Sequence, residues 1–197
     1  WMDERLFIVA LCEGELKNRA LLLQKIFAEK YQIYKRLLPP LHITLEVVYA
    51  PDNLAIESTI EAIKKATKSI EPFTVKSKGF TCFPPPYKSI GLLIEKNHEL
   101  DLVVNKIRSC LEENKVLLAN PFGQKWVFHL TLVNTFLADR EWSDAEFFAA
   151  CNLVEKAPLF VTGEVERIEI WHPTKEQEKM NEGSFRLYRK EATVSPQ

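Results

Sequence analysis

Glycine is scarce in this sequence, and its few glycines do not form a common nucleotide-binding or hydrolase motif. The 197 residues contain six glycines, none of them placed to give GxGxxG, a P-loop or GxSxG. The zinc-protease motif HExxH is absent as well. The sequence therefore lacks the signatures of dinucleotide-binding domains, P-loop NTPases, α/β-hydrolases and zincin proteases.

Neither sign of charge is in excess. The chain carries 26 Lys and Arg against 27 Asp and Glu, which gives a formal net charge of −1. Because non-specific affinity for nucleic acid comes from accumulated Lys and Arg, this balance excludes a protein that coats long RNA or DNA. A local basic site for one small anion remains compatible with it.

Paired cysteines and long apolar runs are also missing. Cys12, Cys82, Cys110 and Cys151 include no CxxC pair, so the usual signature of zinc knuckles and dithiol redox sites is absent. We expect all four to be buried and reduced. Apolar runs such as residues 6–12 are too short to cross a bilayer, and no positively charged leader precedes them. We therefore expect a cytoplasmic protein that does not enter membranes.

Strand and helix patterns are present, and they occur twice in the same order. The first half shows extended segments and two helical segments at residues 5–11, 15–31, 42–49, 52–69 and 73–83. The second half repeats the order at residues 89–95, 97–113, 128–136, a helix from Ser143 and 160–171, with a last extended segment at 184–189. Three consecutive prolines at residues 84–86 separate the halves.

This repeated β-α-β-α-β order indicates an internal duplication. We predict an α+β fold that is bilobal, in which the duplicated units form two mostly antiparallel sheets facing a central cleft. The chain is then a single domain with lobes at about residues 2–86 and 87–197. Exchange of a terminal strand between the lobes is left open.

The middle strand of each half carries the same short motif. Residues 41–45 read Leu-His-Ile-Thr-Leu and residues 128–132 read Phe-His-Leu-Thr-Leu, with His129 87 positions after His42. Because side chains alternate along a strand, the motif His and Thr share one face and the intervening apolar residues share the other. Each motif strand therefore turns a polar face away from the core.

Two imidazoles aimed into one cleft suit general acid-base chemistry at phosphorus. His42 and His129 titrate near neutral pH, so one ring can activate the attacking oxygen while the other protonates the leaving oxygen. The hydroxyls of Thr44 and Thr131 lie beside these rings and can bind non-bridging phosphate oxygens. This arrangement requires neither metal nor cofactor.

Other interpretations of the motifs remain open. A single His-x-Thr on a strand is more often a satisfied histidine at the edge of a core, and only its second copy favours function. A metal site would need a further ligand such as Glu46. A non-catalytic module that binds an RNA end or a cyclic nucleotide, or a structural protein with two coincidental motifs, would show the same residues.

The paired His-x-Thr motifs, at this interval in a chain of this length, resemble the 2H phosphoesterase superfamily. Within it, the chain is similar to the 2′-5′ RNA ligase-like branch, the RNA 2′,3′-cyclic phosphodiesterases, and the resemblance extends to residues 79–87 and 165–171. It implies His42 and His129 as the catalytic pair and Thr44 and Thr131 as phosphate-binding residues. It also implies hydrolysis of a 2′,3′-cyclic phosphate to a 2′-phosphomonoester, or action on a 2′-5′ linkage, in a nucleotide or RNA end. No obligate protein partner is indicated.

Four further residues are weaker candidates for substrate binding. Tyr49 and Phe136 each follow a motif histidine by seven positions, and Tyr87 follows the proline run. These rings could stack on a base, although core packing or a loop contact would equally explain them. Lys88 stands where relatives often carry an arginine, so the resemblance adds it to this group.

Overall fold

The computed structural model describes residues 4–35, 37–120 and 125–190. Its helices are α1 (Glu15–Tyr31), α2 (Asn53–Thr67), α3 (His98–Glu113), α4 (Asp144–Val154) and the 3-10 turn η2 (Gln177–Lys179). Its strands are β1 (Arg5–Glu13), β2 (Ile43–Tyr49), β3 (Phe73–Phe83), β4 (Ser89–Ile94), β5 (Leu117–Leu118), β6 (His129–Val133), β7 (Thr162–Trp171) and β8 (Asn181–Arg186). The predicted order of elements is confirmed, and only β5 and η2 were not predicted.

The helices begin at residues whose side chains or backbone suit that position. Asp52 accepts a hydrogen bond of 2.8 Å from the backbone N–H of Ala55 at the start of α2. Ser143 and Glu146 form the predicted reciprocal capping box of α4. Gly14, which precedes α1, has φ of 82°, a conformation that glycine adopts without a steric penalty.

All strand pairings are antiparallel, and they close on themselves. Neighbouring strands follow the order β1-β2-β6-β4-β3-β7, and β7 pairs back with β1. β8 extends the sheet beside β7, and β5 pairs with β2. The result is a single, barrel-like antiparallel sheet in a mixed α and β fold.

The expectation of two separate sheets is therefore wrong. The third strand of each half pairs with strands of the other half: β3 with β4 and β7, and β7 with β1 and β3, besides its pairing with β8. A further pairing joins the two motif strands, β2 and β6. Residues 2–86 and 87–197 consequently both contribute strands to one hydrogen-bonded sheet, in which β3 of the first half lies between β4 and β7 of the second.

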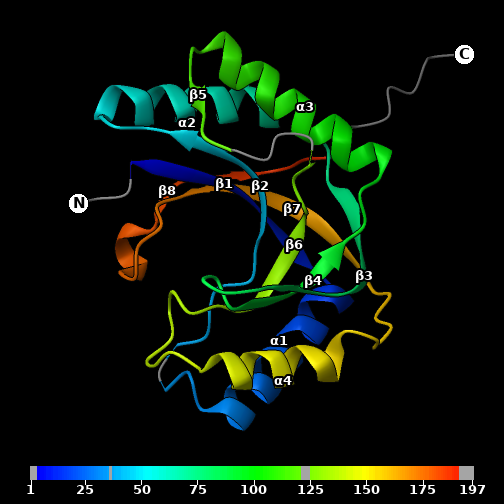
Figure 1. Ribbon diagram of the computed structural model, residues 1–197. Coiled ribbons are helices and arrows are strands. Elements are labelled where there is room, and N and C mark those ends of the chain that lie inside the picture. Colours follow the sequence, from blue (N-terminus) through cyan, green and yellow to red (C-terminus); the bar gives the residue numbers. More distant parts are fainter. Residues whose placement is uncertain (1–3, 36, 121–124, 191–197) are drawn as a thin grey trace, which may run out of the picture.

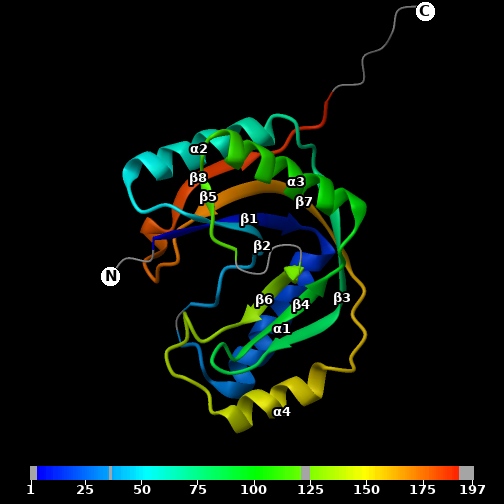
Figure 2. The same cartoon turned by 45° about the horizontal axis from the view of Figure 1, so that its top comes forward.

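Helices cover the sheet on opposite sides. α2 and α3 lie side by side on one side, and α1 and α4 lie on the other, as both views show (Figure 1, Figure 2). Each layer thus combines one helix from each half. Apolar side chains between the strands and both helix layers form the core, with Leu16, Ile43, Ile107, Leu130 and Phe147 all nearly inaccessible to solvent. Among the described helices, none has the length and apolar character needed to cross a membrane.

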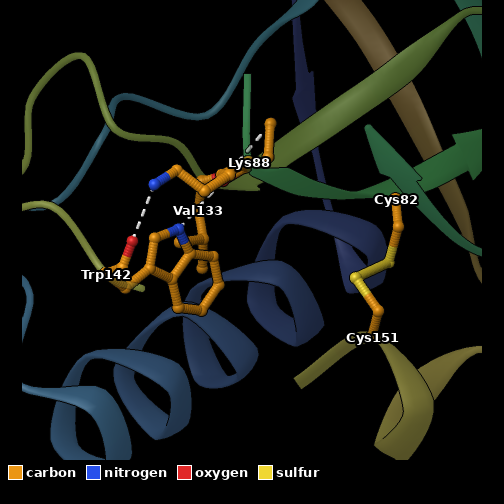
Figure 3. The surroundings of a disulfide bond; sticks show 6 residues. Cys82, Lys88, Val133, Trp142 and Cys151 are labelled. Atoms are coloured by element: carbon orange, nitrogen blue, oxygen red, sulfur yellow. Dashed lines mark hydrogen bonds between the residues drawn. A yellow bond between two sulfur atoms is a disulfide. The ribbon is translucent and has the colours of Figure 1, made fainter. Parts of the chain in front are cut away.

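Two of the four cysteines are joined in a disulfide. Cys82 in β3 is bonded to Cys151 in α4, with their Cα atoms 6.2 Å apart (Figure 3). The expectation of four reduced thiols is wrong for this pair, because the fold brings together cysteines that are 69 positions apart in sequence. Cys12 and Cys110 are buried and free, and burial raises the pKa of the Cys12 thiol to about 11. Reduced cysteines are typical of the cytoplasm, and because Cys82 and Cys151 are oxidised, this pair does not add to the expectation of a cytoplasmic location.

Candidate active site

The two motif strands are neighbours in the sheet. β2 and β6 pair through Ile43 opposite Leu130, two fully buried core side chains. In an antiparallel pair, residues at equal offsets from such a position face each other. The facing pairs are then His42 with Thr131 and His129 with Thr44. In an ideal antiparallel ladder all four side chains then share the face opposite Ile43 and Leu130, and diagonal neighbours such as the two histidines are about 7–8 Å apart.

The two imidazoles are held in the same way. Nδ1 of His42 lies 2.8 Å from the carbonyl oxygen of Pro40, and Nδ1 of His129 lies 2.8 Å from that of Val127. Because a carbonyl oxygen only accepts, the neutral ring carries its proton on Nδ1 and keeps Nε2 as an acceptor. In both motifs the partner carbonyl is two residues before the histidine. Both rings therefore use the same nitrogen, Nδ1, for the backbone and keep Nε2 for proton transfer.

Both histidines favour the neutral form. Burial lowers the pKa of His42 to about 4, against the bond to Pro40, which raises it, and the nearby charge of His129 lowers it further. Burial also lowers the pKa of His129. That the charge of His129 lowers the pKa of His42 indicates that the two rings are near each other.

Each imidazole also contacts an aromatic ring that the sequence interpretation did not select. His42 lies against Trp171 with ring centroids 4.8 Å apart, and His129 lies against Phe83 at 4.5 Å. The ring centroids of Trp126 and His129 are 6.5 Å apart. Phe83 and Trp171 are the last residues of β3 and β7, and they are 88 positions apart, close to the interval between the histidines. This near-equal interval is the sequence signal by which the two aromatic residues could have been selected as a pair.

The motif threonines are almost fully buried, and a glycine makes room beside one of them. Thr44 is 8% and Thr131 7% exposed. The backbone carbonyl of Thr44 accepts a 3.0 Å hydrogen bond from Nε1 of Trp126. Thr131 pairs with Gly91 of β4, where a Cβ would lie 2.8 Å from a carbonyl oxygen of β6 and 3.5 Å from Cδ2 of His129. A side chain at position 91 would therefore push against the strand that carries His129.

None of the three predicted stacking rings is among the described rings in contact with a motif histidine. Tyr49 is at the far end of β2, roughly 20 Å along the strand from His42, and its hydroxyl donates to the Glu4 carboxylate. Phe136 is partly exposed in the loop after β6, and Tyr87 is exposed. Among the described residues, the rings that contact the motif histidines are Phe83, Trp126 and Trp171.

The side chain of Lys88, in the loop before β4, is bound to groups of the segment that precedes α4. Its Nζ donates a 2.8 Å hydrogen bond to the carbonyl oxygen of Trp142, whose Nε1 donates back to the Lys88 carbonyl at 3.1 Å (Figure 3). The Asp144 carboxylate lies 3.5 Å from the same ammonium, and the side chain is only 11% exposed. Lys88 thus joins this loop to the segment that precedes α4.

Glu46, the residue considered as a third metal ligand, has another partner. Its carboxylate is fully buried and lies 2.5 Å from Nε of Arg108 on α3. Its second oxygen accepts a 3.0 Å bond from the backbone N–H of Val47. The donors around this carboxylate therefore hold it toward α3. Among the described residues, no group of three or more His, Cys, Asp or Glu is placed to hold a metal ion.

Comparison with known proteins gives consistent matches in sequence and in fold. The model of the 2′-5′ RNA ligase superfamily matches residues 16–177, a range that includes both motifs. A protein of Oceanobacillus iheyensis named as a phosphoesterase, OB1230, is 28% identical over 131 residues, which cover 66% of this chain and 69% of that protein. The family match and the sequence relative thus agree.

Solved structures share the fold at low sequence identity. TT0787 of Thermus thermophilus superposes with a TM-score of 0.61 and 16% identity, covering 93% of this chain and 97% of that one. Escherichia coli LigT, in its complex with 3′-AMP, gives a TM-score of 0.58 and 13% identity, covering 96% of this chain and 100% of that one. These likenesses extend over almost the whole chain.

Proposed function

The chain belongs to the 2′-5′ RNA ligase superfamily, and on this basis we propose that it is a metal-independent phosphodiesterase. In this proposal it hydrolyses a 2′,3′-cyclic phosphate, or a 2′-5′ linkage, of a nucleotide or RNA end by general acid-base catalysis with two histidines. In this proposal the chain is a single domain made of two copies of one unit, at about residues 2–86 and 87–197. The third strand of each copy, β3 or β7, pairs with strands of the other copy.

One observation carries the proposal. The pairing of Ile43 with Leu130 sets the two His-x-Thr motifs side by side on one face of the sheet. In this proposal both histidines act on a single phosphate, which the spacing of about 7–8 Å between diagonal neighbours of an antiparallel pair would allow. A histidine that only packs at the edge of a core does not require a second His-x-Thr motif on the neighbouring strand. Here the strand of each motif pairs with the strand of the other.

The site's own groups account for each proton in the reaction. Nε2 of one imidazole accepts the proton of the attacking water, while Nε2–H of the other, protonated ring donates to the 3′ oxygen as its bond to phosphorus breaks. Water adds to phosphorus, so the products are a 2′-phosphomonoester and a free 3′ hydroxyl. The Pro40 and Val127 carbonyls hold the Nδ1 side of both rings, and Thr44 and Thr131 donate hydroxyl bonds to the non-bridging oxygens.

Known structures of relatives support a nucleotide as the substrate class. LigT has been crystallised with 3′-AMP, ATP and NADP+. For this chain, Tyr87 and Phe136 remain the proposed contacts to a base, since the Thr135 hydroxyl donates to the Tyr87 carbonyl and brings their loops together. Tyr49 and Lys88 are committed to other partners.

The pH profile follows from the lowered pKa values of the two histidines. Activity needs one neutral ring and one protonated ring, and both pKa values lie below the ordinary 6.5. The protonated ring is lost as the pH rises through the higher of these two values, so we expect kcat/KM for 2′,3′-cyclic AMP to reach its maximum below pH 6.5. One limb should lie near pH 4, the pKa of His42. A maximum above pH 7 in rates measured from pH 4 to 8 would contradict this.

The motif threonines should contribute through their hydroxyls alone. Thr44→Val and Thr131→Val keep the side-chain shape and remove one donor to the phosphate, so each should lower kcat on the order of 10²-fold. Thr44→Ser and Thr131→Ser keep the hydroxyl and should retain most of the activity. Steady-state kinetics on the four variants test this, and equal rates for the Val and Ser variants would exclude the role.

A substrate screen tests the proposed function as a whole. The protein is incubated with 2′,3′-cyclic nucleotides, ADP-ribose cyclic phosphate and 2′-5′ oligoadenylate, with and without EDTA, and the position of the product phosphate is assigned by ³¹P NMR. We expect a 2′-phosphomonoester, formed at the same rate with EDTA. Binding without turnover would favour the non-catalytic module, and loss of activity with EDTA would favour a metal site.

A further inference from the structure

Each half of the chain ends its third strand in an aromatic residue that lies against the motif histidine of the other half. Phe83, at the end of β3, contacts His129, and Trp171, at the end of β7, contacts His42. The two rings are tilted at similar angles to their histidines, 50° for Phe83 and 58° for Trp171. The crossed contacts are a consequence of the exchanged third strands.

Trp171 is held by its side chain and Phe83 by its backbone. Trp171 is 6% exposed, and its Nε1 donates a 2.7 Å hydrogen bond to the Glu169 carboxylate on the same strand. Phe83 pairs with Ser89 of β4 and follows Cys82, whose disulfide to α4 ties down the end of β3. A ring held in this way can restrict the orientation of its neighbour.

The imidazoles need such a restriction. The single bond from Nδ1 to a backbone carbonyl limits rotation of each ring about Cβ–Cγ, but a change of χ1 or χ2 that breaks this one bond would turn the ring away. An aromatic ring packed against the imidazole opposes that rotation and keeps Nε2 directed to the shared face. It also excludes water from one side of the imidazole, in agreement with the burial that lowers both pKa values.

We infer that Phe83 and Trp171 are positioning residues, each of which orients the motif histidine of the other half toward the substrate phosphate. This inference rests on the proposed function for its kinetic consequence, but the orientation of the imidazoles does not depend on which substrate is used. Neither residue needs to touch the substrate for this role.

Histidine titration by NMR tests the inference without a substrate. In Phe83→Ala, water reaches the His129 ring, so its titration should move toward pH 6.5 while that of His42 stays in place. In Trp171→Ala, the titration of His42 should move upward from about 4, and Trp171→Phe should largely restore it. Phe160→Ala is the matched control, because Phe160 is 63% exposed, packs beneath the Lys76 ammonium and contacts neither histidine.

Kinetics separates positioning from direct contact with the substrate. Loss of orientation should lower kcat by roughly 10-fold to 10²-fold, with KM changed less than about twofold. A raised KM with unchanged kcat and unchanged titrations would overturn the inference and make the ring a substrate contact. Unchanged titrations together with unchanged kinetics would overturn it as well.

The outcomes also separate this inference from the proposed function. A wild-type protein that turns over no cyclic phosphate would refute the function, and the titrations would still decide the positioning role. Phe83 is only half-buried, so Phe83→Ala is decisive if Trp171→Ala does not fold, as judged by circular dichroism.

Discussion

Replacing either motif histidine by alanine is expected to lower the turnover of a 2′,3′-cyclic nucleotide by on the order of 10²-fold to 10⁴-fold. His42→Ala and His129→Ala each remove one of the two proton-transfer groups, and no other described histidine lies on this face to replace it. The reaction then depends on water as the base or the acid. Steady-state kcat and KM on purified variants measure the loss.

The double variant sharpens this expectation. Because the two rings act in one step on one phosphate, the His42→Ala/His129→Ala loss should be far smaller than the product of the two single losses. His98→Ala is the matched control, since His98 is the exposed first residue of α3. A folded single variant with activity within a few-fold of the wild type would refute the two-histidine mechanism.

The second large effect is on stability. Arg108→Ala removes the partner of the Glu46 carboxylate, which is fully buried, and should lower the free energy of unfolding by about 3–5 kcal/mol. Most of this loss is the cost of leaving a buried charge unpaired rather than the net contribution of the pair. Urea unfolding followed by circular dichroism measures it.

Two variants distinguish a buried pair from an ordinary surface pair. Glu46→Leu/Arg108→Leu removes both charges at once and should recover most of the lost stability. Lys65→Ala breaks an ion pair with Glu113 whose two side chains are mostly exposed, and it should leave the unfolding free energy near the wild-type value. An Arg108→Ala variant as stable as Lys65→Ala would contradict this account of Glu46.

The elements and the motif pair were accessible from sequence because their signals are local. The apolar periodicity of α3 and the Ser143 capping box each depend on residues within a few positions of one another. The repeated His-x-Thr pattern selected both strands that the sheet places side by side. The alternation of side chains then indicated which residues share a face.

Sequence could not indicate which strands pair. The exchange of β3 and β7 between the halves depends on contacts between residues far apart in the chain, and the same strand pattern suits two separate sheets. The disulfide between Cys82 and Cys151 and the contacts of Phe83 and Trp171 with the histidines follow from that exchange. All were invisible to local patterns.

The weaker candidates show the same limit. Tyr49 was selected by its distance from His42 along the chain, but a strand carries a residue seven positions on to its far end. Lys88 was selected because relatives often carry an arginine at this position, and its ammonium binds the Trp142 carbonyl. Position along the chain identified neighbours in sequence, whereas the rings of Phe83 and Trp171 beside the histidines come from strands two places away in the sheet.

The central claim is that two imidazoles and two hydroxyls hold one phosphate, and ¹⁵N NMR of the histidine side chains during a titration with 2′-AMP tests it most directly. We predict that the Nε2 resonances of His42 and His129 shift together along one binding curve, with one nucleotide bound per chain. A response from only one of the two, or two curves with different dissociation constants, would contradict the shared site.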